Sequence, residues 1–198
     1  AALIFYFAGI RMITFTMLLL AGLMSFIAMI FAAPYRIKRM FAYLNPWDDP
    51  LGSGWQTLQA MKSFALGGLW GRGIGESSQK YSALPEAHTD YIFAIISEEG
   101  GLLIALLLIA LYTLIAFCGF YIAKRCEDKK SFLLSAGITS LIYFQAMMNI
   151  AVVAGLLPST GITLPFISAG GTSLIVYLLC CGILLNISKS IKQPQVKV

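Results

Sequence analysis

The sequence predicts an all-α protein: a polytopic transmembrane helical bundle with a large extracellular loop that contains short interfacial helices. Hydrophobic residues make up 59% of the chain and charged residues 12%, whereas roughly a quarter of a soluble domain is charged. Several apolar runs reach the roughly 20 residues that cross a bilayer. Basic residues gather between these runs, so the net charge of +5 indicates membrane topology and lipid contact, with no nucleic acid as partner.

The apolar runs predict the order of the membrane segments. Residues 12–33 contain no charge, and Pro34 ends the run. The run 91–123 is interrupted early by Glu98-Glu99-Gly100-Gly101, but residues 102–123 suffice to cross. The predicted segments are residues 1–9, as the end of a preceding span, and complete spans over residues 12–33, 91–123, 131–157 and 172–187. Because the chain is apolar from its first residue and has no initial Met, we expect it to be part of a longer protein.

Residues 34–90 form the large extramembrane loop, with mixed charge, Gly, Pro and Trp. Residues 35–44 alternate basic and apolar side chains, which predicts a short interfacial helix. Residues 45–50 are turn-forming, and residues 56–66 have helical periodicity. The glycine-rich residues 67–75 predict a flexible loop.

The arrangement of the spans predicts which loops share a side of the membrane. Three short segments are the turn at Arg11, the loop 124–130 and the tail with Lys189, Lys192 and Lys197. Each is separated from the next by two membrane crossings, so all three lie on the same side. These short segments carry a basic excess, which places them in the cytoplasm. Residues 34–90 and 158–171 therefore face outward.

A cluster of polar residues at 84–90, LPEAHTD, directly precedes the second complete span. It holds the single histidine, His88, and the acids Glu86 and Asp90. Two interpretations stay open at this point. Either Thr89 or Asp90 caps the next helix, or the cluster is a functional site, because ionisable groups are rare in so apolar a chain.

Further polar residues lie near or inside the spans. Glu98 and Glu99 must face protein or water; ion pairing with Arg or Lys is favoured over a role in bracing the same cavity as Asp90. Gln145 and Asn149 lie on one helix face because they are four residues apart. The four cysteines show no metal or disulfide spacing and are interpreted as packing thiols.

Two glycine-containing segments could meet an anion. Gly170-Gly171 begins a predicted helix, where free N–H groups suit a phosphate, although capping by Thr172 or Ser173 is favoured. Arg72, in the glycine-rich loop, and Lys80 offer positive charge, but the spacing matches neither the dinucleotide nor the P-loop motif. From the residues alone, a transporter fits as well as an enzyme.

Several motifs in the same order resemble the SEDS family (shape, elongation, division and sporulation). They are Asn45-Pro46-Trp47, Asp49-Pro50, Gly52-Ser53-Gly54, residues 78–90 ending in LPEAHTD, Glu98-Glu99, and LPFIS at 164–168 before Gly170-Gly171. The NPW turn and Ala87 favour the cell-division branch. Ala169, Thr172 and Gly100 depart from the usual pattern of the family.

The resemblance implies a ten-span peptidoglycan glycosyltransferase of which this chain is the C-terminal half. Members polymerise lipid II at the outer face of the bacterial cytoplasmic membrane, here at the division septum. The essential loop aspartate of the family falls on Asp90, which we interpret as the general base. The alternatives are a lipid II flippase, with Glu98, Glu99, Gln145 and Asn149 along a polar path, and a non-catalytic division scaffold.

The resemblance also suggests secondary roles and partners. Glu86 and His88 would position substrate or tune Asp90. The pyrophosphate would be bound by Lys80, Arg72, or the loop and helix start at Ser168, Gly170 and Gly171. No cofactor is certain, but a divalent cation such as Mg²⁺ or Mn²⁺ would suit this charge; the metal is unknown. Expected partners are a class B penicillin-binding transpeptidase, other division proteins and membrane lipids, and the isolated half is expected to be inactive.

Overall fold

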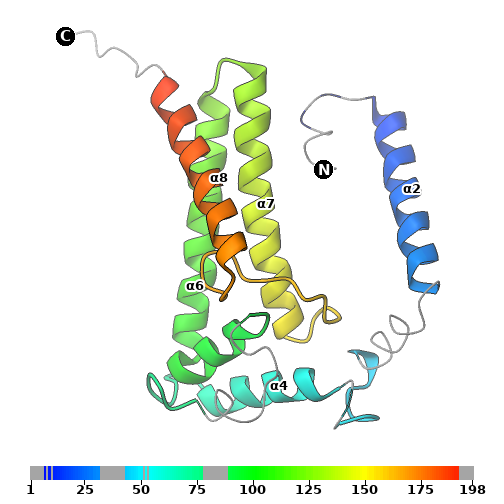
Figure 1. Ribbon diagram of the computed structural model, residues 1–198, viewed down its shortest axis with the longest axis vertical. Coiled ribbons are helices and arrows are strands. Elements are labelled where there is room, and N and C mark those ends of the chain that lie inside the picture. Colours follow the sequence, from blue (N-terminus) through cyan, green and yellow to red (C-terminus); the bar gives the residue numbers. More distant parts are fainter. Residues whose placement is uncertain are drawn as a thin grey trace.

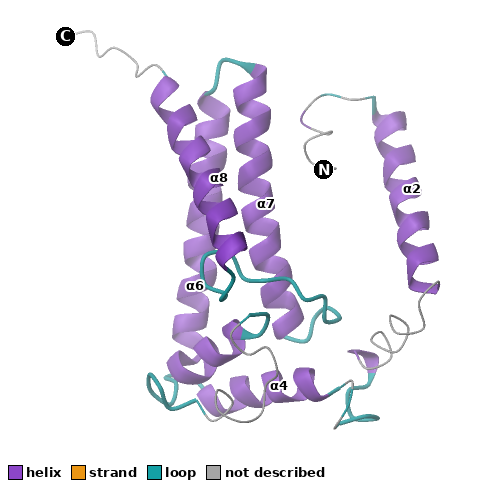
Figure 2. Cartoon of the chain, viewed as in Figure 1, coloured by secondary structure: helices purple, strands orange, loops and turns teal. Residues whose placement is uncertain are grey.

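The computed structural model describes residues 7, 9, 11–31, 43–50, 52, 54–77 and 89–191. Within these residues the regular structure is entirely helical (Figure 2). The longer helices are α2 (Met12–Phe31), α4 (Trp55–Gly67), α6 (Ile92–Arg125), α7 (Lys129–Val153) and α8 (Gly171–Ser190). The all-α prediction is therefore confirmed for the described part of the chain.

Helices α6, α7 and α8 pack as a bundle, and α4 crosses beneath the start of α6, as Figure 1 shows. All three bundle helices are long and apolar enough to cross a membrane. Helix α2 lies apart from the bundle in Figure 1, and many of its large apolar side chains are exposed. The chain is therefore a membrane protein with its described core in three spanning helices.

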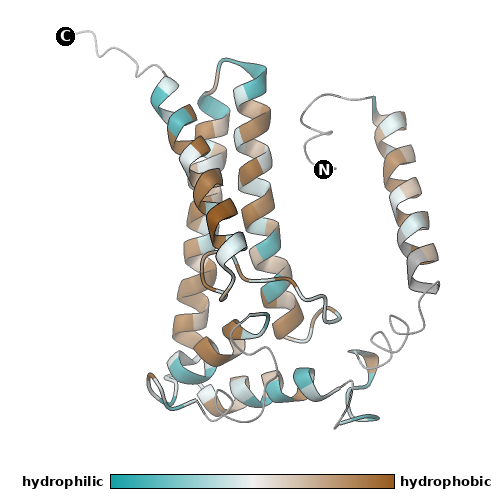
Figure 3. Cartoon of the chain, in the orientation of Figure 1, coloured by the Kyte–Doolittle hydropathy of each residue, from teal (hydrophilic) through white to brown (hydrophobic). Residues whose placement is uncertain are grey.

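The inside of the bundle is built from small and polar side chains, while large apolar ones point outward. At the contact between α6 and α7, Gly119 lies directly against the side chain of Thr139. The buried set includes Ala116, Ala136 and Ser135, whereas Leu107 and Phe117 are exposed. This pattern is typical of membrane helices, in which small residues let backbones approach and apolar ones face lipid. Figure 3 shows apolar residues along the helices and hydrophilic ones at the bundle ends.

The helix boundaries follow local chemistry. Helix α7 ends at Val153, before the end of the predicted span at residue 157, because Gly155 adopts a left-handed φ of 72° just after the cap residue Ala154. A glycine in this conformation is a common stop signal for a helix. The predicted helix at 56–66 is confirmed as α4. The predicted interfacial helix 35–44 lies outside the described residues except for residues 43–44.

Helix α6 breaks at Gly101, which has φ 68° and ψ −172°. Only glycine adopts this backbone conformation readily. A side chain there would collide with the backbone of Leu69 and Gly71. The break separates a short first part, beginning at Ile92 directly after Asp90 and Tyr91, from the long second part.

The glycine-rich loop after α4 fills this break. Four backbone hydrogen bonds replace those that the helix loses: Arg72 N to Glu98 O and Gly73 N to Glu99 O, both 3.0 Å, Leu102 N to Gly68 O, 2.9 Å, and Leu103 N to Leu69 O, 3.4 Å. The loop was expected to be flexible. That expectation is wrong for residues 68–73, because backbone groups at both ends of this stretch are bonded to α6.

Candidate functional site

Asp90 lies in the turn before α6, where three parts of the chain meet. Its residue is half-buried. The amide of Asn149, from α7, donates to the carbonyl oxygen of Asp90 at 2.8 Å and to that of Ile162 at 2.6 Å. One buried side chain thus joins the turn before α6 to the loop between α7 and α8.

A second bridge runs through Ser168. Its hydroxyl donates to the carbonyl oxygen of Thr89 and accepts from the backbone N–H of Leu164 at 2.7 Å. The hydroxyl of Tyr112, from α6, donates to the carbonyl oxygen of Pro165. The loop 158–170 is therefore bonded to Thr89, directly before Asp90, and through Tyr112 to the body of the bundle.

The carboxylate of Asp90 faces the glycine of this loop. A Cβ built on Gly161 would lie 3.5 Å from Asp90 Oδ2, and Gly161 has a left-handed φ of 67°. Phe166 also has a left-handed φ, 66°, and its ring lies 5.3 Å from that of Tyr177 on α8. Left-handed residues other than glycine are uncommon and costly. The loop is thus fixed in an unusual shape next to Asp90.

The start of α8 differs from the capping that the sequence favoured, and α6 begins two residues after Asp90. The cap residue of α6 is Tyr91, which follows Thr89 and Asp90 and makes no side-chain cap bond. At α8 the cap residue is Gly170, also without a side-chain cap. The prediction that Thr172 or Ser173 caps α8 is wrong, because both residues lie inside the helix. The hydroxyl of Ser173 instead donates to the carbonyl oxygen of Gly170 at 2.9 Å. The cap position of α8 is thus occupied by a glycine, which has no side chain that could accept a capping hydrogen bond.

Glu98 is fully buried and makes the ion pair that the sequence favoured. Its Oε1 lies 3.3 Å from Nη1 of Arg72, and its Oε2 accepts from the hydroxyl of Ser77 at 2.7 Å. A buried carboxylate needs such partners, because desolvation of an isolated charge is costly. Arg72, one of the predicted anion ligands, thus binds Glu98. Glu99 has one buried carboxylate oxygen without a partner among the described residues.

Gln145 lies one turn before Asn149 and bonds to the same loop. Its amide donates to the carbonyl oxygen of Thr163 at 3.3 Å. The predicted shared helix face is confirmed, and both amides are used to hold loop backbone. The remaining predicted site residues, Lys80, Glu86 and His88, lie outside the described residues.

Three contributors to the site were missed from sequence. Ser77, Tyr112 and Gly161 showed no signal beyond their residue type; the one available hint was Thr160-Gly161, a turn-forming pair within the polar loop. In the described ranges, no three His, Cys, Asp or Glu residues gather as metal ligands.

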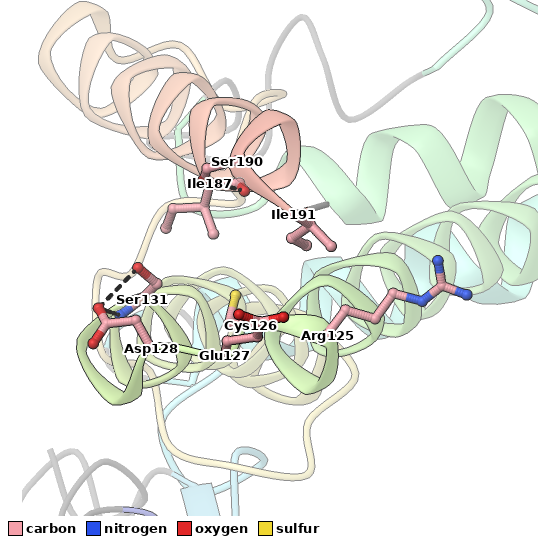
Figure 4. A pocket seen from close by; sticks show the side chains of 8 residues that line it. All are labelled: Arg125, Cys126, Glu127, Asp128, Ser131, Ile187, Ser190 and Ile191. Carbon is pink, nitrogen blue, oxygen red and sulfur yellow. Dashed lines mark hydrogen bonds between the residues drawn. The ribbon is translucent and has the colours of Figure 1, made fainter. Parts of the chain in front are cut away.

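A separate cavity of about 240 Å³ lies at the opposite end of the bundle (Figure 4). Its walls are the ends of α6 and α8 and the start of α7. In Figure 4 Asp128 bonds to Ser131, while Arg125 extends away. The distance along the whole length of α6 separates this cavity from Asp90, so it does not belong to the site. Its lining residues are Arg125, Cys126, Glu127, Asp128, Ser131, Ile187, Ser190 and Ile191.

The fold and site define a class of protein: a polytopic helical membrane protein that carries a fixed carboxylate in a polar loop at one end of its bundle. The family model described as cell cycle protein, FtsW/RodA/SpoVE, matches residues 1–193. The chain therefore belongs to the FtsW/RodA/SpoVE family.

Curated relatives agree. Stage V sporulation protein E of Bacillus subtilis is 48% identical over 184 residues, which cover 93% of this chain and 50% of that protein. The probable peptidoglycan glycosyltransferase FtsW of Geobacter metallireducens is 46% identical over 158 residues, 80% of this chain and 42% of that protein. This chain thus spans about half the length of the curated relatives it matches.

A solved structure described as "Structural coordination of polymerization and crosslinking by a peptidoglycan synthase complex" is also similar. It matches with a TM-score of 0.67 and 29% identity, over 89% of this chain and 50% of that one. The sporulation relative is 48% identical to this chain and the FtsW relative 46% identical. These two identities are similar, so they fit the sporulation and the division branch equally.

Proposed function

We propose that the protein containing this chain is a peptidoglycan glycosyltransferase that polymerises lipid II, with Asp90 as the general base. The observation that carries the proposal is the fixed position of Asp90: its backbone is bonded to Asn149, and its carboxylate faces Gly161. The names of the FtsW relatives support the reaction class.

The chemistry needs one carboxylate in this position. When the acceptor sugar hydroxyl attacks the anomeric carbon of the donor, it must lose its proton. A carboxylate within hydrogen-bond reach takes that proton, and such a base typically contributes about 10²- to 10⁴-fold in rate. A single displacement would invert the anomeric centre. Asp90 is suited to this task because its carboxylate lies against a polar loop. The nearest residue of that loop, Gly161, has no side chain that would cover the carboxylate.

The leaving group, a lipid pyrophosphate, needs charge stabilisation more than protonation. Lys80, with Glu86 and His88 as neighbours, is our proposed ligand, together with the uncapped start of α8 at Gly170 and Gly171. Arg72 is a weaker candidate because Glu98 already binds it. A divalent cation such as Mg²⁺ or Mn²⁺ bound to the pyrophosphate oxygens would supply the same charge stabilisation.

The transport alternative requires four polar residues to line a path through the membrane. The described contacts favour a structural role for three of them, Glu98, Gln145 and Asn149. Glu98 is paired with Arg72 and Ser77, and the amides of Gln145 and Asn149 bind loop carbonyls. These bonds support the enzyme over the flippase.

The proposal includes location and partners. The protein would act at the outer face of the bacterial cytoplasmic membrane, at the septum, with residues 34–90 and 158–171 outward. Its partner would be a class B penicillin-binding transpeptidase, among other division proteins. The similar solved structure, a peptidoglycan synthase complex, supports a partner of this kind.

One experiment separates the three functions. The full-length protein and its transpeptidase partner are incubated with lipid II, and glycan polymer and lipid II flipping in vesicles are measured in parallel. Polymer from the wild type and none from Asp90→Asn supports the enzyme. Flipping that persists in Asp90→Asn, with no polymer from either protein, supports the transporter. Neither activity in the wild type supports the scaffold.

A further inference from the structure

We propose that Asn149 is a positioning residue for Asp90, and that its two hydrogen bonds set the distance between the base and the loop across from it. This inference rests on the proposed function of Asp90. It assigns Asn149 a task in the reaction, beyond the structural role that its place on the inner face of α7 indicates.

The geometry concentrates two bonds on one buried amide. Asn149 is 1% exposed, and its Nδ2 reaches the carbonyl oxygens of both Asp90 and Ile162. Two carbonyl acceptors identify this atom as the amide nitrogen, since an oxygen could not donate to either. The other amide atom, Oδ1, is buried and has no protein partner among the described residues. The side chain thus acts here only as a double donor.

The residues that Asn149 joins are the two sides of the site. Asp90 carries the carboxylate, and Ile162 follows Gly161, the residue that this carboxylate faces. Asn149 therefore fixes the backbone from which the base extends and the loop against which it lies. Misplacement of a reacting group by about 1 Å can cost on the order of 10²-fold in rate. Loss of both bonds should consequently reduce turnover while lipid II still binds.

Gln145 provides a matched control within the same helix face. It also donates to the loop, but to Thr163 O at 3.3 Å, and no bond joins it to Asp90. Replacing either amide by Leu removes the hydrogen bonds that it donates to the loop carbonyls. Of the two replacements, only that of Asn149 removes a hydrogen bond to the turn that carries the base.

The test measures kcat and KM for lipid II in the full-length protein with its partner, per folded protein. The variants are Asn149→Leu, Gln145→Leu, and Asn149→Asp, which keeps the shape of the side chain but removes both N–H donors. Asp90→Asn is measured in the same assay. We expect kcat of both Asn149 variants to fall by about 10- to 100-fold with KM unchanged, and kcat of Gln145→Leu to fall far less.

The outcomes separate this inference from the proposed function. If Asp90→Asn is inactive while Asn149→Asp and Asn149→Leu turn over like Gln145→Leu, Asn149 does not position the base and the inference fails alone. A rise in KM at constant kcat would also overturn it, because that marks lost substrate binding. If Asp90→Asn polymerises at the wild-type rate, the proposed function itself fails. Thermal unfolding of each variant confirms that folded protein is compared.

Discussion

The carboxylate of Glu98 and the guanidinium of Arg72 pair across the break in α6, with 3.3 Å between Oε1 and Nη1. Glu98 is fully buried, whereas the Arg72 side chain is 42% exposed. The pair joins the short first part of α6, which follows Asp90, to the loop after α4. It therefore holds one end of the segment whose other end Asn149 holds.

Arg72→Met should destabilise the protein because the buried charge of Glu98 loses its cationic partner and keeps the hydrogen bond from Ser77. Breaking a buried pair costs about 3–5 kcal/mol. The exposure of Arg72 lowers our expectation to about 2 kcal/mol, since solvent partly screens the pair. Thermal unfolding of the full-length protein in detergent measures this loss. Adding Glu98→Gln to Arg72→Met should recover part of it; a double variant less stable than Arg72→Met would contradict the pairing.

Gly101→Ala should destabilise the kink by more than about 2 kcal/mol, because residues other than glycine rarely adopt its backbone conformation. The added methyl would also meet the backbone of Gly71 and Leu69. Gly182→Ala is the control: its position on α8 is open, and alanine favours a helix by up to about 1 kcal/mol. Equal melting temperatures of the two variants would argue against the kink.

Ser168→Ala tests whether this hydroxyl serves the fold or the substrate. The hydroxyl is bonded to Thr89 O and Leu164 N within the protein. Its loss leaves the Leu164 N–H without that acceptor, at a cost of about 1–3 kcal/mol. We expect lower thermal stability and an unchanged KM for lipid II. A higher KM with wild-type stability would instead identify Ser168 as a substrate ligand.

Asp128 gives the fold a pH dependence at the other end of the bundle. Hydrogen bonds, first from the backbone N–H of Ser131 and then from that of Lys130, hold the pKa of the Asp128 carboxyl below its usual value of about 3.9. Because the pKa of Asp128 is lower in the folded state than in the unfolded state, its ionised carboxylate stabilises the fold at any pH above the unfolded-state pKa. This stabilisation is lost as the pH falls through the folded-state pKa.

Asp128→Ala should therefore melt at a lower temperature than the wild type at pH 7, because α7 loses its N-cap. The difference should shrink as the pH falls below about 4. Thermal unfolding across this range measures it. A difference that stays constant down to the lowest pH would show that the charge of Asp128 does not contribute.

The sequence predicted the helices well where apolar runs were long and ended at Pro or charge. It also placed Gln145 and Asn149 on one face, because helical spacing is local. Their partners could not be predicted: Asn149 bonds to Asp90, 59 residues away, and such a contact depends on how the helices pack. The glycine-rich loop was misjudged for the same reason. Its bonds go to a break in α6, and the pair Gly100-Gly101 does not reveal which glycine turns left-handed.

The candidate site was found at Asp90 from its motif and family resemblance, while its supports came from the structure. Hydroxyl groups such as Ser77 and Tyr112 are common and give no pattern. Their role depends on acceptors that lie far away in sequence, Glu98 and Pro165. The cap of α8 was misassigned because Gly170, which has no side chain, is the cap residue, whereas Thr172 and Ser173 offered better capping chemistry.

The most direct measurement is the initial rate of glycan polymerisation by Asp90→Asn at saturating lipid II, in the full-length protein with its partner. Binding of lipid II is measured on the same protein. Asn keeps the size of the side chain but cannot take a proton. We predict a rate about 10²- to 10⁴-fold below the wild type with binding retained. Polymerisation by Asp90→Asn at the wild-type rate would contradict it.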